Sequence, residues 1–235
     1  MKAVILAGGK GTRLRPYTTS FPKPLMPIED KPILEIIIQQ LKAKGFDEII
    51  LSIGHLAELI QAFFGNGSKL GVRITYVRED KPLGTAGCLG LLKKDLSETF
   101  LVMNGDILMS LDYLEMLKFH KKNKSVATVG LNKRPVQIEF GVADIDKENN
   151  IEKYTEKPSM DYLASMGVYI FEPKALSYIK QDEYLNMPDL IKRLMSSGEI
   201  VKGFIHEGYW LDIGRPDDYK TAHEAFEKDR DKFLS

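Results

Sequence analysis

The chain of 235 residues lacks the features that mark secreted, membrane-spanning or nucleic-acid-binding proteins. It has a single cysteine, Cys88, so no disulfide can form within it. It has no signal peptide and no apolar run of membrane-spanning length. Lys plus Arg and Asp plus Glu both number 33, so no net charge attracts a nucleic acid or a membrane surface. We therefore expect a cytoplasmic protein with no nucleic-acid and no membrane partner.

A second absence is local, because residues 1–28 contain neither Asp nor Glu. The apolar run at 3–6 predicts a buried strand, and three glycines follow it closely. Glycine lets backbone N–H groups approach an anionic ligand, since no Cβ stands in the way. The glycines are Gly8, Gly9 and Gly11, and the cations among and after them are Lys10, Arg13, Arg15 and Lys23. This composition indicates a binding site for a polyphosphate.

The glycine pattern differs from the two best-known phosphate-binding motifs. The dinucleotide fingerprint needs a third glycine near Leu14, and a P-loop needs Gly-Lys-Ser/Thr. The chain instead reads Leu-Ala-Gly-Gly at 6–9, Gly-Thr-Arg-Leu at 11–14, Pro16, and Pro-Lys-Pro-Leu at 22–25. This string resembles the signature of the sugar-1-phosphate nucleotidyltransferases, also called nucleotide-sugar pyrophosphorylases. The motifs are most similar to those of mannose-1-phosphate guanylyltransferase-like members.

The rest of the chain alternates predicted strands and helices. We expect strands near 49–53, 72–77, 100–103, 125–130, 140–145, 152–156 and 164–171, and helices near 33–43, 57–64, 83–92, 114–123 and 217–229. In the first half, this spacing favours a parallel sheet with helices on both faces. Residues 146–151 are expected to connect a hairpin, because Asn149 and Asn150 tolerate positive φ.

The resemblance covers nearly the whole chain and implies one α/β domain over 1–235. Its fold would be a Rossmann-like three-layer sandwich with a mostly parallel central sheet, similar to GT-A glycosyltransferases. The resemblance places a nucleotide-binding half at about 1–110 and a sugar-phosphate-binding half at about 111–235. The length leaves no room for the C-terminal β-helix domain of longer relatives. Relatives are often dimers or tetramers, but no stretch of the sequence identifies an interface, so the choice between a monomer and a homo-oligomer stays open.

The segment Pro-Leu-Gly-Thr-Ala-Gly at 82–87 separates a predicted strand from a predicted helix. Its glycines would let a flat base or ribose pack against bare backbone, or Thr85 would simply cap the helix. In the family this segment lies over the nucleobase. The chain resembles guanylyltransferases here, because the thymidylyl version usually has Gln just after the alanine.

Asp106 follows the strand at 100–103, within Asn-Gly-Asp. A carboxylate at the carboxyl end of a central parallel strand faces the crevice where α/β sheets bind ligands, although a lone Asn-Gly-Asp more often caps a helix or forms a turn. The resemblance makes Asp106 the first magnesium ligand and Asp212, within Tyr-Trp-Leu-Asp-Ile-Gly, the second. Together they would leave positions open on Mg²⁺ for phosphate oxygens and water.

The sugar-phosphate half departs from the family at one point. Glu156-Lys157-Pro158 resembles the motif that meets the sugar phosphate, and Gly141 matches a glycine that faces the hexose. Residues 164–171 match a strand that usually reads Asn-Ala-Gly-Ile-Tyr, but Ser165 and Met166 replace Asn and Ala. The replaced asparagine normally contacts the sugar, so the identity of the sugar stays open.

The resemblance assigns three groups of residues besides the metal ligands. Catalytic roles fall to Arg13, Lys23 and Asp106. Nucleotide binding falls to Leu6, Ala7, Gly8, Gly9, Gly11, Thr12, Arg13, Lys23, Pro82, Gly84, Thr85, Asn104 and Gly105. Sugar-phosphate binding falls to Gly141, Glu156, Lys157, Ser165 and Gly167.

The implied reaction joins a nucleoside triphosphate, with GTP favoured, to mannose 1-phosphate or a related hexose or heptose 1-phosphate. Cytidylyl, uridylyl or thymidylyl transfer to another sugar 1-phosphate is the alternative. A catalytically silent subunit that binds nucleotide sugars is a second alternative, but such subunits commonly lose one of the four residues Arg13, Lys23, Asp106 and Asp212. A glycosyltransferase would predict Asp-x-Asp where this chain has Asn104-Gly105-Asp106.

Overall fold

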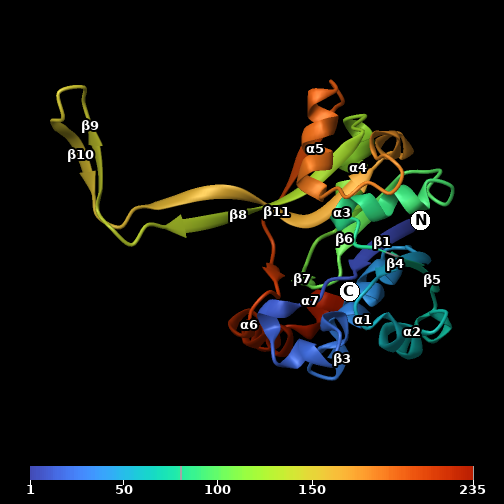
Figure 1. Cartoon of the computed structure of the whole chain (residues 1–235). Coiled ribbons are helices and arrows are strands. Elements are labelled where there is room, and N and C mark those ends of the chain that lie inside the picture. The colour runs from blue at the N-terminus through green and yellow to red at the C-terminus, as the bar shows by residue number, and fades with distance from the viewer. Residues whose placement is uncertain (80, 235) are drawn as a thin grey trace.

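A computed structural model describes residues 1–79 and 81–234 of the chain (Figure 1). A seven-stranded sheet lies at its centre, in the order β12-β8-β11-β6-β1-β4-β5. All of these strands run in one direction except β11, which is antiparallel to both of its neighbours. The strands are β1 Lys2–Ala7, β4 Glu48–Ile53, β5 Arg73–Arg78, β6 Phe100–Asn104, β8 Ala127–Gln137, β11 Ser159–Phe171 and β12 Val201–His206. The mostly parallel sheet is therefore confirmed.

Alternate side chains of the central strands enter two separate hydrophobic cores, as the two-residue period of a strand requires. Ile5 of β1 points into one core and Val4 into the other, and both are fully buried. The first core is covered by α1 (Ile33–Ala43), α2 (Ala57–Phe64), α4 (Tyr113–Lys122), α6 (Pro216–Lys228) and α7 (Arg230–Leu234). The second is covered by α3 (Gly84–Gly87) and α5 (Met187–Ser196). The chain therefore forms the expected three layers.

Several predicted elements agree closely with the structure. The helix α2 matches its predicted bounds, and α4 begins where Asp112 accepts hydrogen bonds from the N–H groups of Leu114 (2.9 Å) and Glu115 (3.2 Å). Such a cap satisfies two of the free donors at a helix N-terminus. Asn149 has φ 68° in the turn between β9 (Val142–Ile145) and β10 (Ile151–Thr155), which confirms the predicted hairpin.

The helix predicted over residues 83–92 is confirmed in its position, but it is not one continuous α-helix. The structure has the single turn of α3 followed by a 3₁₀ helix at Cys88–Leu92. Gly84 has φ +76°, and the N–H groups of Ala86 and Gly87 donate to Leu185 O at 2.9 and 3.0 Å. Glycine lowers helix propensity, and these contacts with a distant segment fix the backbone in another conformation. Tertiary contacts thus replace the longer helix.

Two strands are longer than predicted. The pair β8–β11 continues from the sheet as a two-stranded ribbon, to the pairing of Gln137 with Ser159. The ribbon, followed by the β9–β10 hairpin, extends away from the helices in Figure 1. The extension of β8 was not predicted because residues 131–137 are mostly polar, include Pro135, and do not show the apolar pattern of a buried strand.

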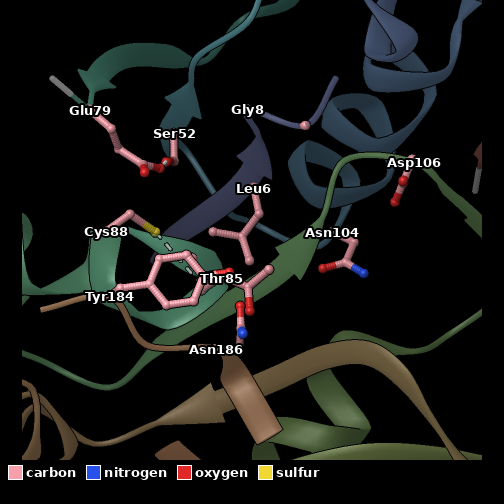
Figure 2. Close-up of a pocket in the computed structure, with 12 residues that line it drawn as sticks. Leu6, Gly8, Ser52, Glu79, Thr85, Cys88, Asn104, Asp106, Tyr184 and Asn186 are labelled. Atoms are coloured by element: carbon pink, nitrogen blue, oxygen red, sulfur yellow. Dashed lines mark hydrogen bonds between the residues drawn. The ribbon is translucent and has the colours of Figure 1, made fainter. Parts of the chain in front are cut away.

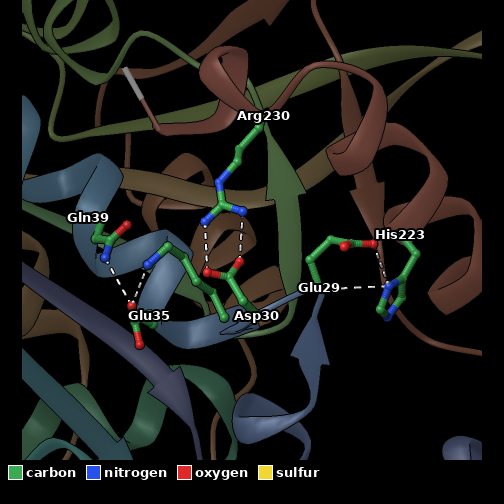
Figure 3. Close-up of polar contacts among 7 residues, drawn as sticks. Glu29, Asp30, Glu35, Gln39, His223 and Arg230 are labelled. Atoms are coloured by element: carbon green, nitrogen blue, oxygen red, sulfur yellow. Dashed lines mark hydrogen bonds and ion pairs between the residues drawn. The ribbon is translucent and has the colours of Figure 1, made fainter.

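Polar contacts hold residues 29–31 to the C-terminal helices and to α1 (Figure 3). Arg230 contacts both carboxylate oxygens of Asp30, at 2.8 and 3.0 Å. The hydrogen bond from Arg230 lowers the pKa of Asp30, and His223 lies 3.6 Å from Glu29. The turn between the short strands β2 (Pro27–Ile28) and β3 (Lys31–Pro32) is thus anchored just after residues 8–25, which we call the glycine-rich segment.

Among the described residues, no helix has both the length and the apolar character needed to cross a membrane.

The packing of α7 yields a stability prediction. Phe233 is buried, with its ring centroid 5.9 Å from that of Phe226 and 5.3 Å from that of Tyr209. Phe233→Ala should lower the free energy of unfolding by about 3–5 kcal/mol, because it removes a buried ring and leaves a cavity. Phe63→Ala, at a ring that is 50% exposed, is the control and should have a much smaller effect in urea unfolding. Equal effects would contradict the packing described for α7.

Candidate active site

The carboxyl ends of β1, β4 and β6 meet at one edge of the sheet, where the glycine-rich segment begins. A Cβ on Gly54, just after β4, would lie 2.9 Å from Gly8 O, just after β1. The N–H of His55 donates to the same oxygen at 3.4 Å. Two bare backbones therefore approach each other here, and open space surrounds the next residue, Gly9. This edge is where parallel α/β sheets bind their ligands.

The segment after β1 folds into three short 3₁₀ turns, Thr12–Leu14, Tyr17–Thr19 and Lys23–Leu25. Gly11 begins the first turn with φ +59°, and the hydroxyl of Thr18 donates to its carbonyl oxygen at 2.7 Å. A Cβ at Gly11 would lie 3.1 Å from Thr18 Cγ2 and 3.2 Å from Lys23 Cβ. Gly11 is thus required both by its backbone angle and by its close neighbours. The turns bring Arg13 and Lys23 toward the sheet edge.

Two cations and two carboxylates gather at this edge. Lys23, only 7% exposed, places Nζ 2.5 Å from Asp106 Oδ2. Arg13 Nη2 lies 4.0 Å from Asp212 Oδ2, with both side chains partly exposed. The carboxylates are neighbours because β13 (Trp210–Asp212) pairs with β7 (Ile107–Met109), and the N–H of Ile213 donates to Asp106 O at 3.0 Å. The structure thus brings together the four residues named for charge neutralisation and metal binding.

The environment of Asp212 disfavours its charged form. Burial raises its pKa, and the negative charge of Asp106 raises it further. The positive charges of Lys23 and Arg13 act in the opposite direction but do not cancel the shift. Two neighbouring carboxylates in a partly buried site therefore lack full compensation from the protein. A divalent cation would supply the missing positive charge.

Two adjoining clefts open on this edge and share Leu6, Gly9 and Asp106. The first has a volume of about 370 Å³ and lies between β1, β6 and α3 (Figure 2). The second, of about 220 Å³, is lined by residues of the first and third 3₁₀ turns, Arg13 and Lys23 among them, and by Gly214. The first cleft has a largely uncharged wall wide enough for a base and ribose, and the second holds the cations. Adjacent binding of a nucleoside and its phosphates would suit this division.

The far wall of the first cleft consists of two segments hydrogen-bonded to each other. The hydroxyl of Thr85 accepts a hydrogen bond from the N–H of Met187 at 2.8 Å, and Leu185 N donates to Leu83 O at 2.8 Å. A Cβ on Gly84 would lie 2.6 Å from Leu185 O, so the backbones touch. Thr85 therefore bonds to the N-terminus of α5, rather than capping its own helix, and the wall is fixed from both sides.

An ion pair holds the outer part of this wall. Arg193 donates two hydrogen bonds to the carboxylate of Glu183, at 2.9 and 2.7 Å, and a third to Tyr178 O at 2.6 Å. The hydrogen bonds from Arg193 lower the pKa of Glu183 to about 2. Tyr184, which follows Glu183, lines the cleft (Figure 2). The pair thereby orients a cleft residue that it does not itself touch.

The predicted nucleotide-binding residues, apart from Pro82, line the two clefts. The first cleft is lined by Leu6, Gly8, Gly9, Gly84, Thr85 and Asn104, and the second by Ala7, Gly11, Thr12, Arg13, Lys23 and Gly105. Pro82 precedes the wall and is not among the lining residues of either cleft.

The structure divides the predicted sugar-phosphate residues into two groups. Gly167 has φ +71°, and a Cβ there would lie 2.5 Å from Asn104 Nδ2, so this glycine sits against the first cleft. Ser165 Oγ lies 3.1 Å from the hydroxyl of Tyr169 on the same strand. Gly141, Glu156 and Lys157 instead lie where the ribbon joins the β9–β10 hairpin, and none of them lines either cleft. Within this chain the two groups are not brought together.

Sequence reasoning missed five residues that line the first cleft: Ser52, Glu79, Cys88, Tyr184 and Asn186. Glu79 accepts hydrogen bonds from Leu83 N at 2.6 Å and from the Ser52 hydroxyl at 3.3 Å. Burial raises the pKa of Cys88 to about 11, so this thiol stays neutral. Asn186 offered a weak signal, since Asn before Met-Pro is typical of a helix start. The others came together only through the fold.

The chain matches the family described as "Nucleotidyl transferase" over residues 2–229. It is 37% identical to UTP--glucose-1-phosphate uridylyltransferase of Synechocystis sp. and 34% identical to mannose-1-phosphate guanylyltransferase of Mycobacterium tuberculosis. These matches cover 94% and 92% of this chain, but only 62% of each relative. The chain thus spans about three fifths of the length of these relatives.

Solved structures show the same similarity. HddC from Yersinia pseudotuberculosis, complexed with GMP-PN, has a TM-score of 0.75 at 27% identity, over 96% of this chain and 99% of that one. A structure described as a putative glucose-1-phosphate thymidylyltransferase from Bacillus anthracis has a TM-score of 0.76 at 28% identity, over 96% and 94%.

The Glu183–Arg193 pair predicts a pH-dependent contribution to stability. A carboxyl group with a lowered pKa in the folded state stabilises the fold fully above its unfolded value, near 4.5, and loses that contribution as the pH falls toward about 2. Glu183→Gln should therefore lower the free energy of unfolding at pH 7 and make no difference near pH 2. Urea titrations at several pH values test this. Glu224→Gln, in a more exposed pair on α6, is the control and should show little dependence.

Proposed function

The chain belongs to the nucleotidyl transferase family, and we propose that it transfers a nucleotidyl group from a nucleoside triphosphate to a sugar 1-phosphate. The attacking oxygen of the sugar phosphate forms a bond to the α-phosphorus, while the bond from that phosphorus to the bridging oxygen breaks. The products are a nucleotide-diphosphate sugar and pyrophosphate. No covalent intermediate with the protein is needed, so binding, alignment and charge neutralisation account for the catalysis.

The observation that carries this proposal is the charge cluster beside the glycine-rich turns. Lys23 and Arg13 face Asp106 and Asp212 at the edge where two clefts join. Two anionic substrates repel each other, and fixed cations at their meeting point lower that repulsion before the reaction begins. The cluster therefore supports phosphoryl-group chemistry more specifically than the fold does.

Each element of the site has a role under this proposal. The bare backbone at Gly8, Gly9 and Gly11 contacts the β- and γ-phosphates. Arg13, which is 63% exposed at its side chain, stabilises charge on the departing pyrophosphate. Lys23 lies deeper and neutralises the α-phosphate. The first cleft takes the base and ribose, against the wall formed by Gly84 and Thr85.

Asp106 and Asp212 fit a magnesium ion. Their carboxylates are adjacent through the β7–β13 pairing, and burial, together with the negative charge of Asp106, raises the pKa of Asp212. Oxygen ligands with positions left for water and phosphate are typical of Mg²⁺ sites. When bound, the ion would supply positive charge to the phosphates of both substrates. Lys23 contacts Asp106 and would hold that carboxylate in place.

Guanylyl transfer to mannose 1-phosphate, or to a related hexose or heptose 1-phosphate, is the specific reaction we propose. The Pro-Leu-Gly-Thr-Ala-Gly wall and the guanylyltransferase names among the relatives support it. The uridylyltransferase similarity supports uridylyl transfer as the second candidate. The wall shown by the structure consists mainly of backbone and small side chains. Its Gly84–Thr85 part would contact a base through backbone groups, and Glu79 is a charged side chain that also lines this cleft.

Pyrophosphate release tests the proposed reaction. The chain, with magnesium, is incubated with each common nucleoside triphosphate and a panel of hexose and heptose 1-phosphates. We expect one pair to release pyrophosphate much faster than the others, with GTP as the nucleotide. If only a pair containing UTP turned over rapidly, the reaction would be uridylyl transfer, the second candidate. Binding of nucleotide sugars without any release would identify a silent binding subunit instead.

The carboxylates yield a mutational prediction. Asp106→Asn and Asp212→Asn should each lower kcat about 100-fold or more, because each removes a charge that acts on the reacting phosphates. Asn keeps the shape of both side chains, but Asp106→Asn leaves the buried Lys23 without its charged partner, so circular dichroism must show that each variant is folded before its kcat is compared. Asp217→Asn, at an exposed position in the first turn of α6, serves as the control and should retain activity. Full activity of either site variant would remove it from the proposed mechanism.

A further inference from the structure

In the described part of the chain, no helix and no other strand covers the outer ribbon and the hairpin (Figure 1). We define residues 136–163 as the arm, which comprises the outer part of β8–β11 and the β9–β10 hairpin. The described residues outside 136–163 are the body. Two hydrogen bonds join the hairpin to the ribbon, from Ile138 N to Pro158 O (3.0 Å) and from Lys157 N to Phe140 O (3.2 Å). In Figure 1 the hairpin lies at the end farthest from the helices. Two-stranded hairpins are marginally stable in water unless something packs against them.

The arm carries a concentration of exposed apolar side chains. Among the described residues, 18 large apolar residues are exposed, and 8 of them fall in these 28 positions. Their combined exposed surface is on the order of 900 Å² if each fully exposed residue contributes about 200 Å². A stable protein interface buries about 800 Å² per partner. The arm therefore carries enough apolar surface for a dimer contact. Its exposed residues are Val136, Phe140, Ile145, Ile151, Tyr154, Met160, Tyr162 and Leu163.

The charge of the arm indicates what covers it. Residues 136–163 hold seven carboxylates and three lysines, a net charge of −4. The complete chain has no net charge, so the remainder carries +4. Two arms packed against each other would bring like charges together, whereas an arm on a body brings opposite charges together. The complementary surface is therefore the body.

The glycine-rich segment is the part of the body that matches the arm best. It has no carboxylate, and its exposed cations include Lys10 and Arg15. Tyr17 and Phe21 in the same segment are 60% and 42% exposed, so it also offers aromatic surface. This surface borders the second cleft, which Arg13 lines. An acidic, apolar arm seated here would lie beside the proposed phosphate-binding site.

The arm does not reach its own glycine-rich segment in this structure. The ribbon continues the central sheet, with Tyr169 paired with Val129 in the body and Ser159 paired with Gln137 at the far end. These pairings direct the arm away from the body (Figure 1). To fold back, the arm would have to give up ribbon hydrogen bonds, whereas a second copy can receive it without any change in the ribbon.

We propose that two copies of this chain exchange arms, so that each active site combines the body of one copy with residues 140–157 of the other. This inference rests on the proposed function. The charged side chains that line the two clefts are Arg13, Lys23, Glu79 and Asp106, which sum to zero. A sugar phosphate would add negative charge that these residues do not balance. Lys157, exposed beside Gly141 and Glu156, is the cation that the second copy brings.

Complementation between two inactive variants tests the exchange. Asp106→Asn disables the body, and Lys157→Ala disables the arm. The two variants are co-expressed with different tags, and the heterodimer is isolated through both tags. With exchanged arms, one of its two sites has an intact body and an intact arm, so about half of the wild-type activity returns. An inactive heterodimer, or full activity of Lys157→Ala alone, would overturn the proposal.

The oligomeric state gives an independent readout that does not require activity. The test variant is Phe140→Asp, at a side chain of the arm that is 76% exposed. The control is Met195→Asp, at a side chain of α5 that is 60% exposed. Sedimentation should show a dimer for the wild type and for Met195→Asp, but a monomer for Phe140→Asp. The circular dichroism spectrum of Phe140→Asp should match that of the wild type, which shows that the monomer is folded. A monomeric wild type at micromolar concentration, or a dimer that survives Phe140→Asp, would refute arm exchange. If the wild type is a dimer that Phe140→Asp dissociates, but releases no pyrophosphate, only the proposed function is refuted.

Discussion

The contact between the Lys23 ammonium and the Asp106 carboxylate is the constraint on which the rest of the site depends. Lys23 is 7% exposed, and an unpaired charge at that depth would be costly. The contact joins the end of the glycine-rich segment to the carboxyl end of β6. It therefore fixes three 3₁₀ turns that have few side-chain hydrogen bonds of their own. Opposite charges at the sheet edge thus hold the glycine-rich backbone in place.

The same edge depends on a second long-range contact, the short ladder between β7 and β13. This ladder places Asp212 beside Asp106, although 105 residues separate their positions in the chain. The C-terminal helices that follow pack into the core through Phe226 and Phe233, and Arg230 is bound to Asp30. The C-terminal part of the chain thus supports Asp212 on one side and the end of the glycine-rich segment on the other.

The body and the arm obey different physical rules. In the body, alternate side chains of each strand enter two dry cores, and burial holds the sheet between its helices. In the arm, backbone pairing sets the shape while apolar side chains remain exposed to water. A segment with a strong backbone ladder and an uncovered apolar surface is suited to bind something outside its own chain. Exchange with a second copy would satisfy that surface and bring Lys157 to a site that lacks it.

The sequence by itself determined the elements whose signals are local. Apolar periodicity located the central strands and α2, the glycines and cations at 8–23 indicated the phosphate-binding segment, and the motif around Asp106 gave its position after β6. Local patterns suffice there because burial on a sheet or helix leaves a regular trace in the chain. The tertiary structure alone decided the adjacency of Asp212, the wall from Leu185 and Asn186, and the shortened α3. It also decided that Gly141, Glu156 and Lys157 lie on an arm outside the clefts, because hydrogen bonds between distant segments leave no periodic trace in the sequence.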